Sequence, residues 1–568
     1  MEDFVHLHVH THYSILDGQS KVPRLVDKAV ADGMRGMAIT DHGVMYGIKE
    51  FSDYCEKVNK GRKKEGLPPF KPIFGCEMYV ARRRKEDKVK ELGDNGGYHL
   101  IVLAKNYEGY KNLIRLVSRA WTDGYYYRPR TDREDLAKYH EGLIVCSACI
   151  AGEIPAKILK GDMDGANEAC RWYHEVFGDD FYLELQRHEV KDPTIVANRE
   201  TFPLQQKANR VLIEMAREQG IKLVCTNDCH FEDRDTAEAH DHLLCLSTGK
   251  DLNDPNRMRY SKQEWFKTRQ EMNDIFADVP EAMANTLEIL DKVEMYSIDH
   301  GPIMPFFPIP ASFGTEEQWR ERFSEEELFR EFTSDENGNN PMPVEEGQKV
   351  IDRLGGYDKI YRIKFEADYL AHLAYEGAKE RYGNPLPEDV KEHINFELHV
   401  MKTMGFPGYF LIVSDFINAA RKELGVWVGP GRGSAAGSVV AYCLGITQID
   451  PMKYDLLFER FLNPDRVNLP DIDTDFDDDG RGKVLRWVMD KYGHENCAHI
   501  ITYQAMATKN SIKDVARVEK LPLDKSNALC KAIPDRLPDG MKMNLTNAIK
   551  ATPELRAAEA SADPQERN

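Results

Sequence analysis

Four histidines alternate near the start of the chain, in the stretch FVHLHVHTHYSILDG of residues 4–18. They are His6, His8, His10 and His12. In an extended strand, side chains two positions apart share a face and lie about 6.6–6.8 Å apart. Neutral imidazole is a good ligand for zinc, manganese and iron. We therefore predict that His8 and His10 bind one metal ion or two adjacent ions, rather than packing as core residues.

Further side chains of metal-binding type follow the ends of later apolar stretches. They are Asp41, His42, Glu77, His99, Cys149, Asp228 and His230. Ligand residues at the ends of several strands are typical of a barrel active site on one rim. Cys146 and Cys149 would also suit half of a zinc ribbon, but no second Cys-x-x-Cys motif accompanies them. Clustered divalent cations favour phosphoester hydrolysis, because they lower the pKa of a shared water and hold the attacking and leaving oxygens.

A second group of residues begins at the glycine-rich stretch WVGPGRGSAAGS, residues 427–438. Its glycines let backbone N–H groups approach a phosphate, the following helix attracts anions at its N-terminus, and Arg432 can add a charge-assisted contact. Neither a dinucleotide-binding fold nor a Walker loop fits, because the second strand and the Gly-Lys-Ser/Thr sequence are missing. Further along, Asp471, Asp473 and Asp475 alternate. A phosphate-binding loop followed by paired aspartates suits nucleotidyl transfer with two Mg²⁺ ions on shared carboxylates.

These side chains need a scaffold, and the chain up to about residue 295 predicts one. Apolar, β-branched stretches predict buried strands within 33–43, 71–81, 98–106, 142–152, 179–188 and 221–231. Amphipathic stretches such as 21–34 and 201–220 predict helices between them. The repeated strand-then-helix order favours parallel strands that close into a barrel or sheet.

The second half of the chain has a different pattern. Residues 296–316 are rich in proline and read as a linker, and residues 333–348 read as a polar loop or insertion. Long helices are predicted over 360–425, and a strand is predicted over 467–476. More helices are expected from there to about residue 550.

Length and composition limit the class of protein. The 568 residues are enough for roughly three or four domains. No apolar run approaches the ~18 residues of a membrane span, and no signal peptide is present, so no membrane contact is expected. Eleven cysteines without a secretion signal favour reduced thiols and a cytoplasmic location. The net charge of −19 argues against a protein that coats nucleic acid all over, but allows phosphate chemistry through bound cations.

The stretches HLHVHTHYSILDG, ITDHG, GCEMYV, CSACIAGEI and TNDCHF resemble the PHP (polymerase and histidinol phosphatase) family. The resemblance implies a (β/α)7 barrel that holds up to three metal ions. Matched motif by motif, the implied ligands are His8, His10, Asp17, His42, Glu77, His99, Cys149, Asp228 and His230. All have metal-binding side chains here, so bound Zn²⁺ or Mn²⁺ is expected. His6, His12 and Asp41 lie beside the pattern and are interpreted as supporting or packing residues.

The glycine-rich stretch, taken with DLLFERFLNPDRVNLPDIDTDF, closely resembles bacterial DNA polymerase III alpha subunits. This resemblance covers essentially the whole chain. It implies template-directed DNA synthesis, with Asp471 and Asp473 as catalytic ligands of Mg²⁺ in the palm. The side chains and backbone expected at the incoming nucleotide, together with Arg432, are Gly433, Ser434, Gly437 and Ser438.

The stretch ITYQAMATKNSIKDVARVEKL resembles the thumb of the same family. Its basic residues Lys509, Lys513 and Arg517 recur on one helix face, and we predict that they contact the DNA backbone. The expected fold class is α/β. The expected domains are a PHP barrel over 1–295, a nucleotidyltransferase-like α+β palm over 296–495 with an insertion near 310–348, and a helical thumb over 496–568 that is incomplete or at its end.

The family's third catalytic aspartate, its fingers and its clamp-binding regions have no counterpart in this sequence. We therefore expect the chain to be an N-terminal portion of a longer polypeptide that cannot synthesise DNA alone. The motifs leave no room for an inserted exonuclease domain, which indicates the simpler type of alpha subunit.

The resemblance also implies partners. They are primer–template DNA, deoxynucleoside triphosphates, a proofreading exonuclease subunit docked on the PHP domain, and a sliding clamp and clamp loader that bind regions absent from this sequence. The PHP site would act as a metal-dependent 3′–5′ exonuclease or as a scaffold with structural metals, and the residues leave both open. A free-standing PHP phosphoesterase would explain the histidines but would leave residues 427–517 without a role.

Overall fold

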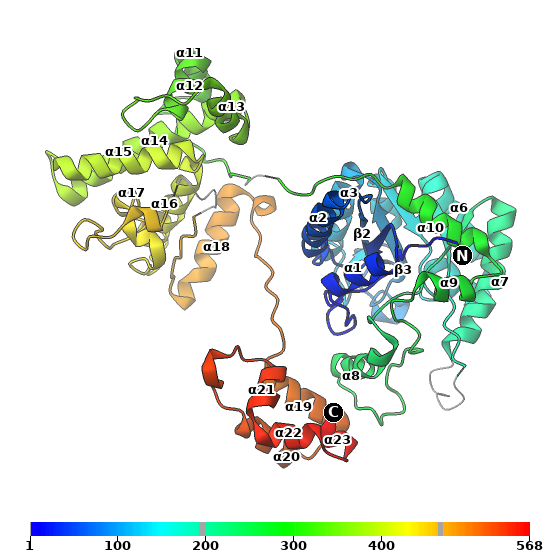
Figure 1. Ribbon diagram of the computed structural model, residues 1–568. Helices are drawn as coiled ribbons and strands as arrows, with labels where there is room; N and C mark the ends of the chain where they lie inside the picture. The colour runs from blue at the N-terminus through cyan, green and yellow to red at the C-terminus, as the bar shows by residue number, and fades with distance from the viewer. Residues whose placement is uncertain (1, 192–199, 301–302, 464–469) are drawn as a thin grey trace. The chain divides into compact units, whose positions relative to one another are not determined.

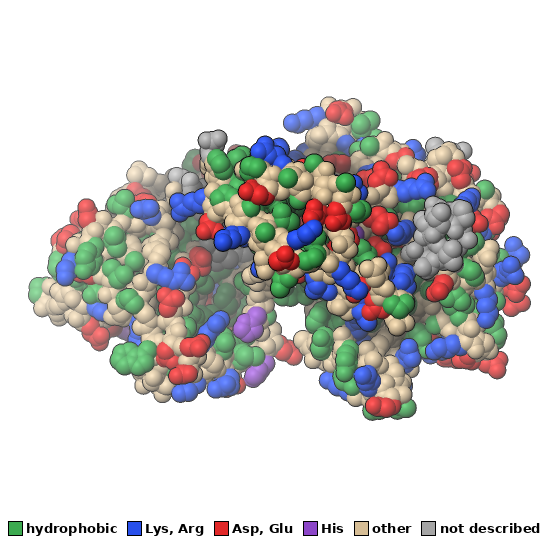
Figure 2. All heavy atoms as spheres, turned by 90° about the horizontal axis from the view of Figure 1, so that it is seen from below, with side chains coloured by type: hydrophobic (Ala, Val, Ile, Leu, Met, Phe, Trp, Pro, Cys, Tyr) green, Lys and Arg blue, Asp and Glu red, His purple; other side chains and the backbone are tan. Residues whose placement is uncertain are grey.

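The computed structural model describes residues 2–191, 200–300, 303–463 and 470–568. It forms two compact units: Met1–Ile298 together with Gln504–Asn568, and Asp299–Tyr503. No helix within the described ranges is long and apolar enough to cross a membrane. On the face that Figure 2 displays, acidic and basic side chains are interspersed, so the net charge of −19 does not gather there in one patch.

A mixed sheet forms the centre of the first unit (Figure 1). Its strands are β1 Gly36–Ile39, β2 Lys71–Val80, β3 Tyr98–Ala104, β4 Arg130–Thr131, β5 Leu143–Cys146, β6 Phe181–Leu185 and β7 Lys222–Cys225. Six of them pair in the order β1-β2-β3-β5-β6-β7, and β4 pairs with β2. These six lie in the stretches predicted from the sequence, so the α/β class and the strand positions are confirmed. The two-residue strand β4 had no sequence signal.

Strand β3 runs antiparallel to both of its neighbours, β2 and β5, whereas the other pairs in the order are parallel. The expectation of uniformly parallel strands was therefore wrong at β3. A parallel connection needs a crossover, usually a helix. The connection from β2 to β3 contains only the short 3-10 turn η1, Lys90–Leu92, so the chain returns beside β2 in the opposite direction.

The histidine-rich segment runs extended between β1 and the residues after β7. On one side, Ala38 N donates to His6 O and Thr40 N donates to Val9 O, both at 2.8 Å. On the other side, His10 N donates to Cys229 O at 2.7 Å. This backbone pairing gives a single parallel bridge, between Val9 and Cys229, and does not make the segment a continuous strand. The segment thereby joins the two edges of the sheet, as closure into a barrel requires.

Helices pack around this sheet (Figure 1). They are α1 Val22–Ala31, α2 Ile48–Lys64, α3 Tyr107–Thr122, α4 Arg133–Lys138, α5 Glu153–Lys160, α6 Met163–Phe177, α7 Thr201–Gln219, α9 Arg269–Ile275 and α10 Pro280–Lys292, while α8 Ala237–Thr248 lies farther from the sheet. Their ends follow local chemistry. The side chain of Asn106 caps α3, a capping box at Thr268 starts α9, and Gly220 ends α7 at a φ of 68°.

The C-terminal helices belong to the same compact unit, and the first of them contacts α8. They are α19 Thr508–Glu519, α20 Leu523–Ala532, α21 Leu545–Ala551, α22 Pro553–Glu559 and α23 Pro564–Arg567. His242 Nε2 of α8 lies 2.6 Å from Glu519 Oε1, and Leu252 N donates to Val518 O at 3.3 Å. The buried Val518 shows that this contact excludes water.

The second unit is helical. Its α-helices are α11 Glu316–Arg322, α12 Glu325–Thr333, α13 Val344–Arg353, α14 Tyr357–Tyr382, α15 Glu388–Thr403, α16 Pro407–Lys422, α17 Val439–Cys443 and α18 Asp478–Tyr492. The long helices predicted over 360–425 are confirmed as α14, α15 and α16. Their apolar faces form a core with α17, in which Leu370, Ile394 and Phe410 are fully buried.

The strand predicted over 467–476 is wrong for its described part, and residues 467–469 lie outside the described residues. Within 470–476, Phe476 alone pairs, through a single antiparallel bridge to Val428. A palm sheet is therefore reduced to this bridge among the described residues of the second unit. Two short segments without further strands beside them make a marginal sheet, which explains why the alternation of aspartates did not produce a strand.

Candidate functional sites

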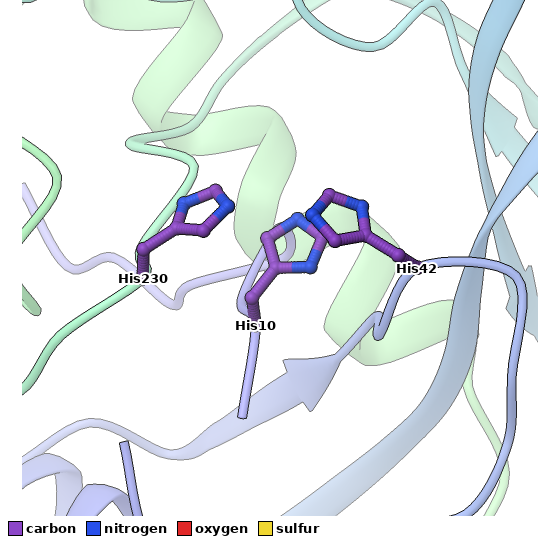
Figure 3. A group of neighbouring side chains, drawn as sticks. All are labelled: His10, His42 and His230. Atoms are coloured by element: carbon purple, nitrogen blue, oxygen red, sulfur yellow. The ribbon is translucent and has the colours of Figure 1, made fainter. Parts of the chain in front are cut away.

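Three groups of metal-binding side chains converge in the first unit. They are His10, His42 and His230; His8, His10 and Asp228; and Glu77, His99 and Cys149. Within each group the ligand atoms lie within 4.8 Å of one another. Figure 3 shows the rings of His10, His42 and His230 pointing toward one another from separate segments. The remaining predicted ligand, Asp17, joins them through an oxygen 2.9 Å from His42 Nε2.

The strands bring these residues together from distant parts of the sequence. His42 follows β1, Glu77 lies in β2, His99 lies in β3, Cys149 follows β5, and Asp228 follows β7. Asp228 adopts a φ of 47°, in the left-handed region that non-glycine residues rarely occupy. Such strain is common at functional sites, where the surrounding structure imposes it.

The group of His8, His10 and Asp228 has the spacing of a metal site. His8 Nε2 lies 3.1 Å from His10 Nε2, and Asp228 Oδ1 lies 3.0 Å and 3.2 Å from these two nitrogens. Nitrogen and oxygen ligands lie about 2.0–2.2 Å from a zinc ion. Three donors with these separations can therefore share one ion.

Neighbouring groups fix the orientation of three histidines through Nδ1. His8 Nδ1 lies 2.8 Å from Glu184 Oε1, and His10 Nδ1 lies 3.0 Å from Ser14 Oγ. His230 Nδ1 donates to the carbonyl of Asp228 at 2.8 Å. In each ring this leaves Nε2 directed at the cluster. A hydrogen bond at one nitrogen that frees the other is the usual arrangement of metal-binding histidines.

The electrostatics of the cluster favour bound positive charge. Burial opposes ionisation of Glu77, but the neighbouring His99 and His42 outweigh it and hold the pKa of this carboxyl well below its usual range. The pKa of Asp228 is likewise lowered, because His8 and His230 outweigh burial. Among the described residues, the buried oxygen Asp17 Oδ1 accepts no hydrogen bond. A buried carboxylate oxygen without a hydrogen bond is costly unless a cation lies beside it, so this donor set fits divalent metal ions.

Three residues of the cluster were missed by sequence reasoning. They are Glu184, His240 and Tyr260. Glu184 had a signal, because a carboxylate inside the apolar strand FYLEL needs a partner. His240 in α8 and Tyr260 after it are single residues without a motif. By contrast, His6 packs between Phe4 and Phe266, and burial lowers the pKa of His6 to about 3, as expected of a packing residue.

The second site lies in the second unit, where the glycine-rich stretch meets the aspartates. Arg432 donates to Asp473 Oδ2 at 2.7 Å and to Asp475 Oδ2 at 3.2 Å. Gly433 lies beside Asp473, since a Cβ added at this glycine would be in ordinary contact with Asp473 Oδ2, at 3.4 Å. Gly433 also has a φ of 72°, which glycine tolerates best. Asp471 is exposed.

The predicted nucleotide-binding residues divide into two sets. Arg432, Gly433 and Ser434 are exposed, whereas Gly437 and Ser438 are buried. The hydroxyl of Ser438 donates to Glu397 Oε2 at 2.7 Å, and Val439 N and Val440 N also donate to Glu397. Glu397 thus accepts the hydrogen bonds of the N-terminus of α17, which was expected to face a phosphate. As the structure stands, Ser438 is not accessible to a nucleotide.

The three basic residues predicted to contact DNA lie on α19, and two of them have partners within the protein. Lys509 Nζ lies 3.2 Å from Asp535, and Arg517 donates to the carbonyl of Lys250 at 3.3 Å. Lys513 is exposed. The stripe therefore exists as a helix face, but Arg517 also holds α19 against the end of α8.

Two family models match the chain. The PHP domain matches residues 6–188, and the bacterial DNA polymerase III alpha NTPase domain matches residues 368–567. Together they include the candidate metal ligands from His8 to Cys149 and the whole of the second site. Asp228 and His230 lie beyond the matched part of the PHP model.

Curated relatives match over nearly the whole chain. The DNA polymerase III subunit alpha of Borreliella burgdorferi is 41% identical over 96% of this chain and 41% of its own length. The corresponding subunit of Thermus aquaticus is 40% identical over 98% of this chain and 44% of its own length. The chain thus spans about two fifths of the length of these relatives. An amidohydrolase structure from Chromobacterium violaceum covers 40% of this chain and 87% of its own at 12% identity, with a TM-score of 0.25.

The PHP model falls within the first unit, the polymerase model covers much of the second unit and the C-terminal helices of the first, and the relatives extend across both units. By these matches the chain belongs to the bacterial DNA polymerase III alpha family and carries a PHP domain.

Proposed function

We propose that this chain serves in template-directed DNA synthesis, as the part of a DNA polymerase III alpha subunit that holds a PHP domain, much of the palm and a thumb. The observation that supports this function best is the contact of Arg432 with Asp473 beside Gly433. It joins a phosphate-binding loop to the aspartates that would hold Mg²⁺. Residues 1–295, 296–495 and 496–568 are the corresponding domains in this proposal.

Within the proposed palm, each exposed group has a distinct role. Asp471 and Asp473 would hold Mg²⁺, which supports nucleotidyl transfer by stabilising charge on the phosphate oxygens when bound. Arg432 would leave Asp473 and turn to the triphosphate, since arginine binds phosphate oxygens well. Gly433 and Ser434 would present backbone N–H groups to the same ligand.

Equilibrium binding of a fluorescent deoxynucleoside triphosphate in the presence of Mg²⁺ tests this palm. Asp473→Asn is expected to weaken binding about 10-fold or more, because it removes a charged ligand of the cation. Asp479→Asn, on the exposed first turn of α18, is the matched control and is expected to bind like the unaltered chain. Equal binding by both variants would contradict the proposal.

A second function is proposed for the PHP domain: a metal-dependent phosphoesterase that acts as a 3′–5′ exonuclease on primer ends. It is supported by the complete set of nine ligand-type side chains around one cluster. The proposed ions are Zn²⁺ or Mn²⁺, up to three in number, given the imidazole, carboxylate and thiol donors. A docking scaffold with structural metals is the alternative role.

Shortening of a labelled, 3′-mismatched primer by the purified chain with Zn²⁺ or Mn²⁺ tests the exonuclease. Loss of shortening in a double variant, His8→Ala with His10→Ala, is the expected result, and circular dichroism checks that the variant folds. If the unaltered chain binds metal but does not shorten the primer, the domain is a scaffold and proofreading belongs to another subunit.

The partners follow from the same proposal. They are primer–template DNA, deoxynucleoside triphosphates, a proofreading exonuclease docked on the PHP domain, and a sliding clamp with its loader. The proposed location of the protein is the cytoplasm. The exposed Lys513 is proposed to contact the DNA backbone, with Lys509 and Arg517 beside it. Lys513→Glu is expected to weaken primer–template binding. It is also expected to reduce the slope of the logarithm of the binding constant against the logarithm of the salt concentration by about one.

A further inference from the structure

An imidazole outside the predicted ligand set is directed at the metal cluster. His240, in α8, is 2% exposed, and among the described residues its Nε2 has no hydrogen-bond partner. This nitrogen lies 3.7 Å from Asp17 Oδ1, a buried oxygen that also accepts no hydrogen bond there. Two buried polar atoms therefore face each other across a distance too long for a hydrogen bond.

The surroundings place further donors beside the same oxygen. His230 Nε2 lies 3.9 Å from Asp17 Oδ1, and its ring centroid lies 5.7 Å from that of His240. The hydroxyl of Tyr260 lies 3.3 Å from both Asp17 Oδ2 and His230 Nε2. The two oxygens of Asp17 thus have different neighbours. Oδ2 lies near His42, and Oδ1 lies near His230 and His240.

The position of the His240 ring is fixed by packing. Phe231 lies against it with a centroid separation of 5.1 Å, and Tyr260 meets it edge-on at 5.2 Å. Asp17 is the carboxylate nearest to Nε2. A ring held by aromatic neighbours on its sides presents one nitrogen to the cluster.

Distances decide between the two ways of satisfying these atoms. Hydrogen bonds of this type require about 2.7–3.2 Å, so at 3.7 Å the atoms His240 Nε2 and Asp17 Oδ1 remain without a hydrogen bond. Leaving a buried donor or acceptor unpaired destabilises the fold. Two ligands of one transition-metal ion can be up to about 4.4 Å apart, twice the usual bond length. Both separations at Asp17 Oδ1, 3.7 Å and 3.9 Å, fall within that limit.

We propose that His240 is a further metal ligand of this centre, binding through Nε2 a divalent ion that Asp17 also holds. The inference rests on the proposed metal centre and extends its ligand set to α8. Since imidazole and carboxylate donors meet at this position, the ion is of the zinc, manganese or iron class.

Metal titration of the stripped protein tests this ligand. We would measure stoichiometry and affinity for Zn²⁺ and Co²⁺ by calorimetry and elemental analysis, with the visible absorption of Co²⁺ as a report on coordination. His240→Ala is expected to lose one equivalent of metal or to weaken one site at least 10-fold, and to change the Co²⁺ spectrum. Added imidazole is expected to restore both.

A neighbouring histidine provides the matched control. His242 lies in the same helix but contacts Glu519 of α19 instead of the cluster. His242→Ala is expected to bind metal like the unaltered chain, without an effect of imidazole. His240→Gln, which retains more of the side-chain volume, is measured in parallel and replaces the alanine variant if circular dichroism shows that variant to be unfolded.

The outcomes separate this inference from the proposed function. If the unaltered chain binds no divalent metal, the proposed centre itself fails. If it binds metal and the His240 variants match it in stoichiometry, affinity and Co²⁺ spectrum, the role of His240 is overturned while the centre stands. A weaker affinity with an unchanged Co²⁺ spectrum also overturns it, because His240 would then act through packing.

Discussion

The two candidate sites differ in how far the protein interior builds them. In the metal cluster, donors such as His8, His10 and Glu77 are at most 1% exposed and converge from separate strands. Around the aspartates of the second unit, the side chains of Arg432, Asp473 and Asp475 are 58%, 39% and 60% exposed. Buried carboxylates need a compensating charge, whereas exposed ones are satisfied by water. The comparison teaches that the buried donors of the first site need bound cations for stability, whereas the exposed groups of the second site do not.

Removal of metal provides the largest expected contrast. Chelation is expected to lower the thermal unfolding temperature of the first unit by several degrees, because a ligand at about 1,000 times its Kd stabilises a fold by about 4 kcal/mol. The second unit is expected to unfold unchanged. Differential scanning calorimetry with and without a chelator measures both transitions. Identical traces would show that the buried cluster is stable without cations, and the proposed difference between the two sites would be wrong.

A buried glutamate gives the second unit its own strong pH dependence. Burial raises the pKa of Glu397 to about 7, above the ordinary value of 4.5. The folded state then holds the proton more tightly than the unfolded state, so stability is full below pH 4.5 and is lost as the pH rises through 7. The expected loss is about 3 kcal/mol, since each pKa unit corresponds to about 1.4 kcal/mol.

Urea unfolding at several pH values between 4.5 and 8 measures this loss. Glu397→Gln removes the titrating group and is expected to flatten this component of the pH dependence, while the amide oxygen still accepts from the N-terminus of α17. An unaltered pH profile in the variant would assign the dependence to other groups. The result would sharpen the comparison, because it would locate the buried charge of the second unit away from its exposed aspartates.

A second buried glutamate tests how the metal cluster is supported. Glu184 accepts from Thr226 Oγ1 at 2.5 Å and contacts His8 Nδ1. Glu184→Gln is expected to weaken metal binding about 10- to 100-fold, the usual effect of losing a group that orients a ligand. Calorimetric titration with Zn²⁺ measures it, and Glu288→Gln, outside the cluster, is the control. Equal affinities in all three proteins would show that His8 needs no such support.

Sequence patterns predicted the elements that repeat a local signal. Six of the seven strands of the first unit lie in apolar stretches that the sequence marks as strands, and most of the candidate ligands lie within those strands or soon after them, so the pattern led to both. Single side chains that reach the site through tertiary packing carry no such signal. Glu397 meets Ser438 across 41 positions of sequence, and His240 meets Asp17 from a helix far along the chain. These contacts could not be predicted, since no periodicity marks them.

The failures share a physical cause. Alternating aspartates at 471–475 satisfy the period of a strand, but a strand also needs neighbours, and only Phe476 finds one. Likewise, glycine and serine at 437–438 suit a phosphate loop, but Glu397 supplies the hydrogen-bond acceptors from within the protein. Local sequence states what a segment can do, and the partners that fold against it decide which of those options is used.

The smallest expected effect on stability concerns the exposed site. Arg432→Ala breaks two ion pairs that are open to solvent, and such pairs contribute about 0–1 kcal/mol. The unfolding transition of the second unit is therefore expected to stay almost unchanged. Binding of a deoxynucleoside triphosphate is expected to weaken about 10-fold, because a charge-assisted contact to phosphate contributes more than a neutral one.

Arg432→Lys separates the two contributions of this side chain. It keeps the charge but loses the planar fork that contacts Asp473 and Asp475 together. Fluorescence titration with the nucleotide is expected to give a Kd between those of the unaltered chain and the alanine variant. If Arg432→Ala instead destabilised the second unit as much as chelation destabilises the first, the exposed ion pairs would also contribute strongly to stability. The contrast between a buried site that needs its ligand to be stable and an exposed site that is stable without it would then no longer hold.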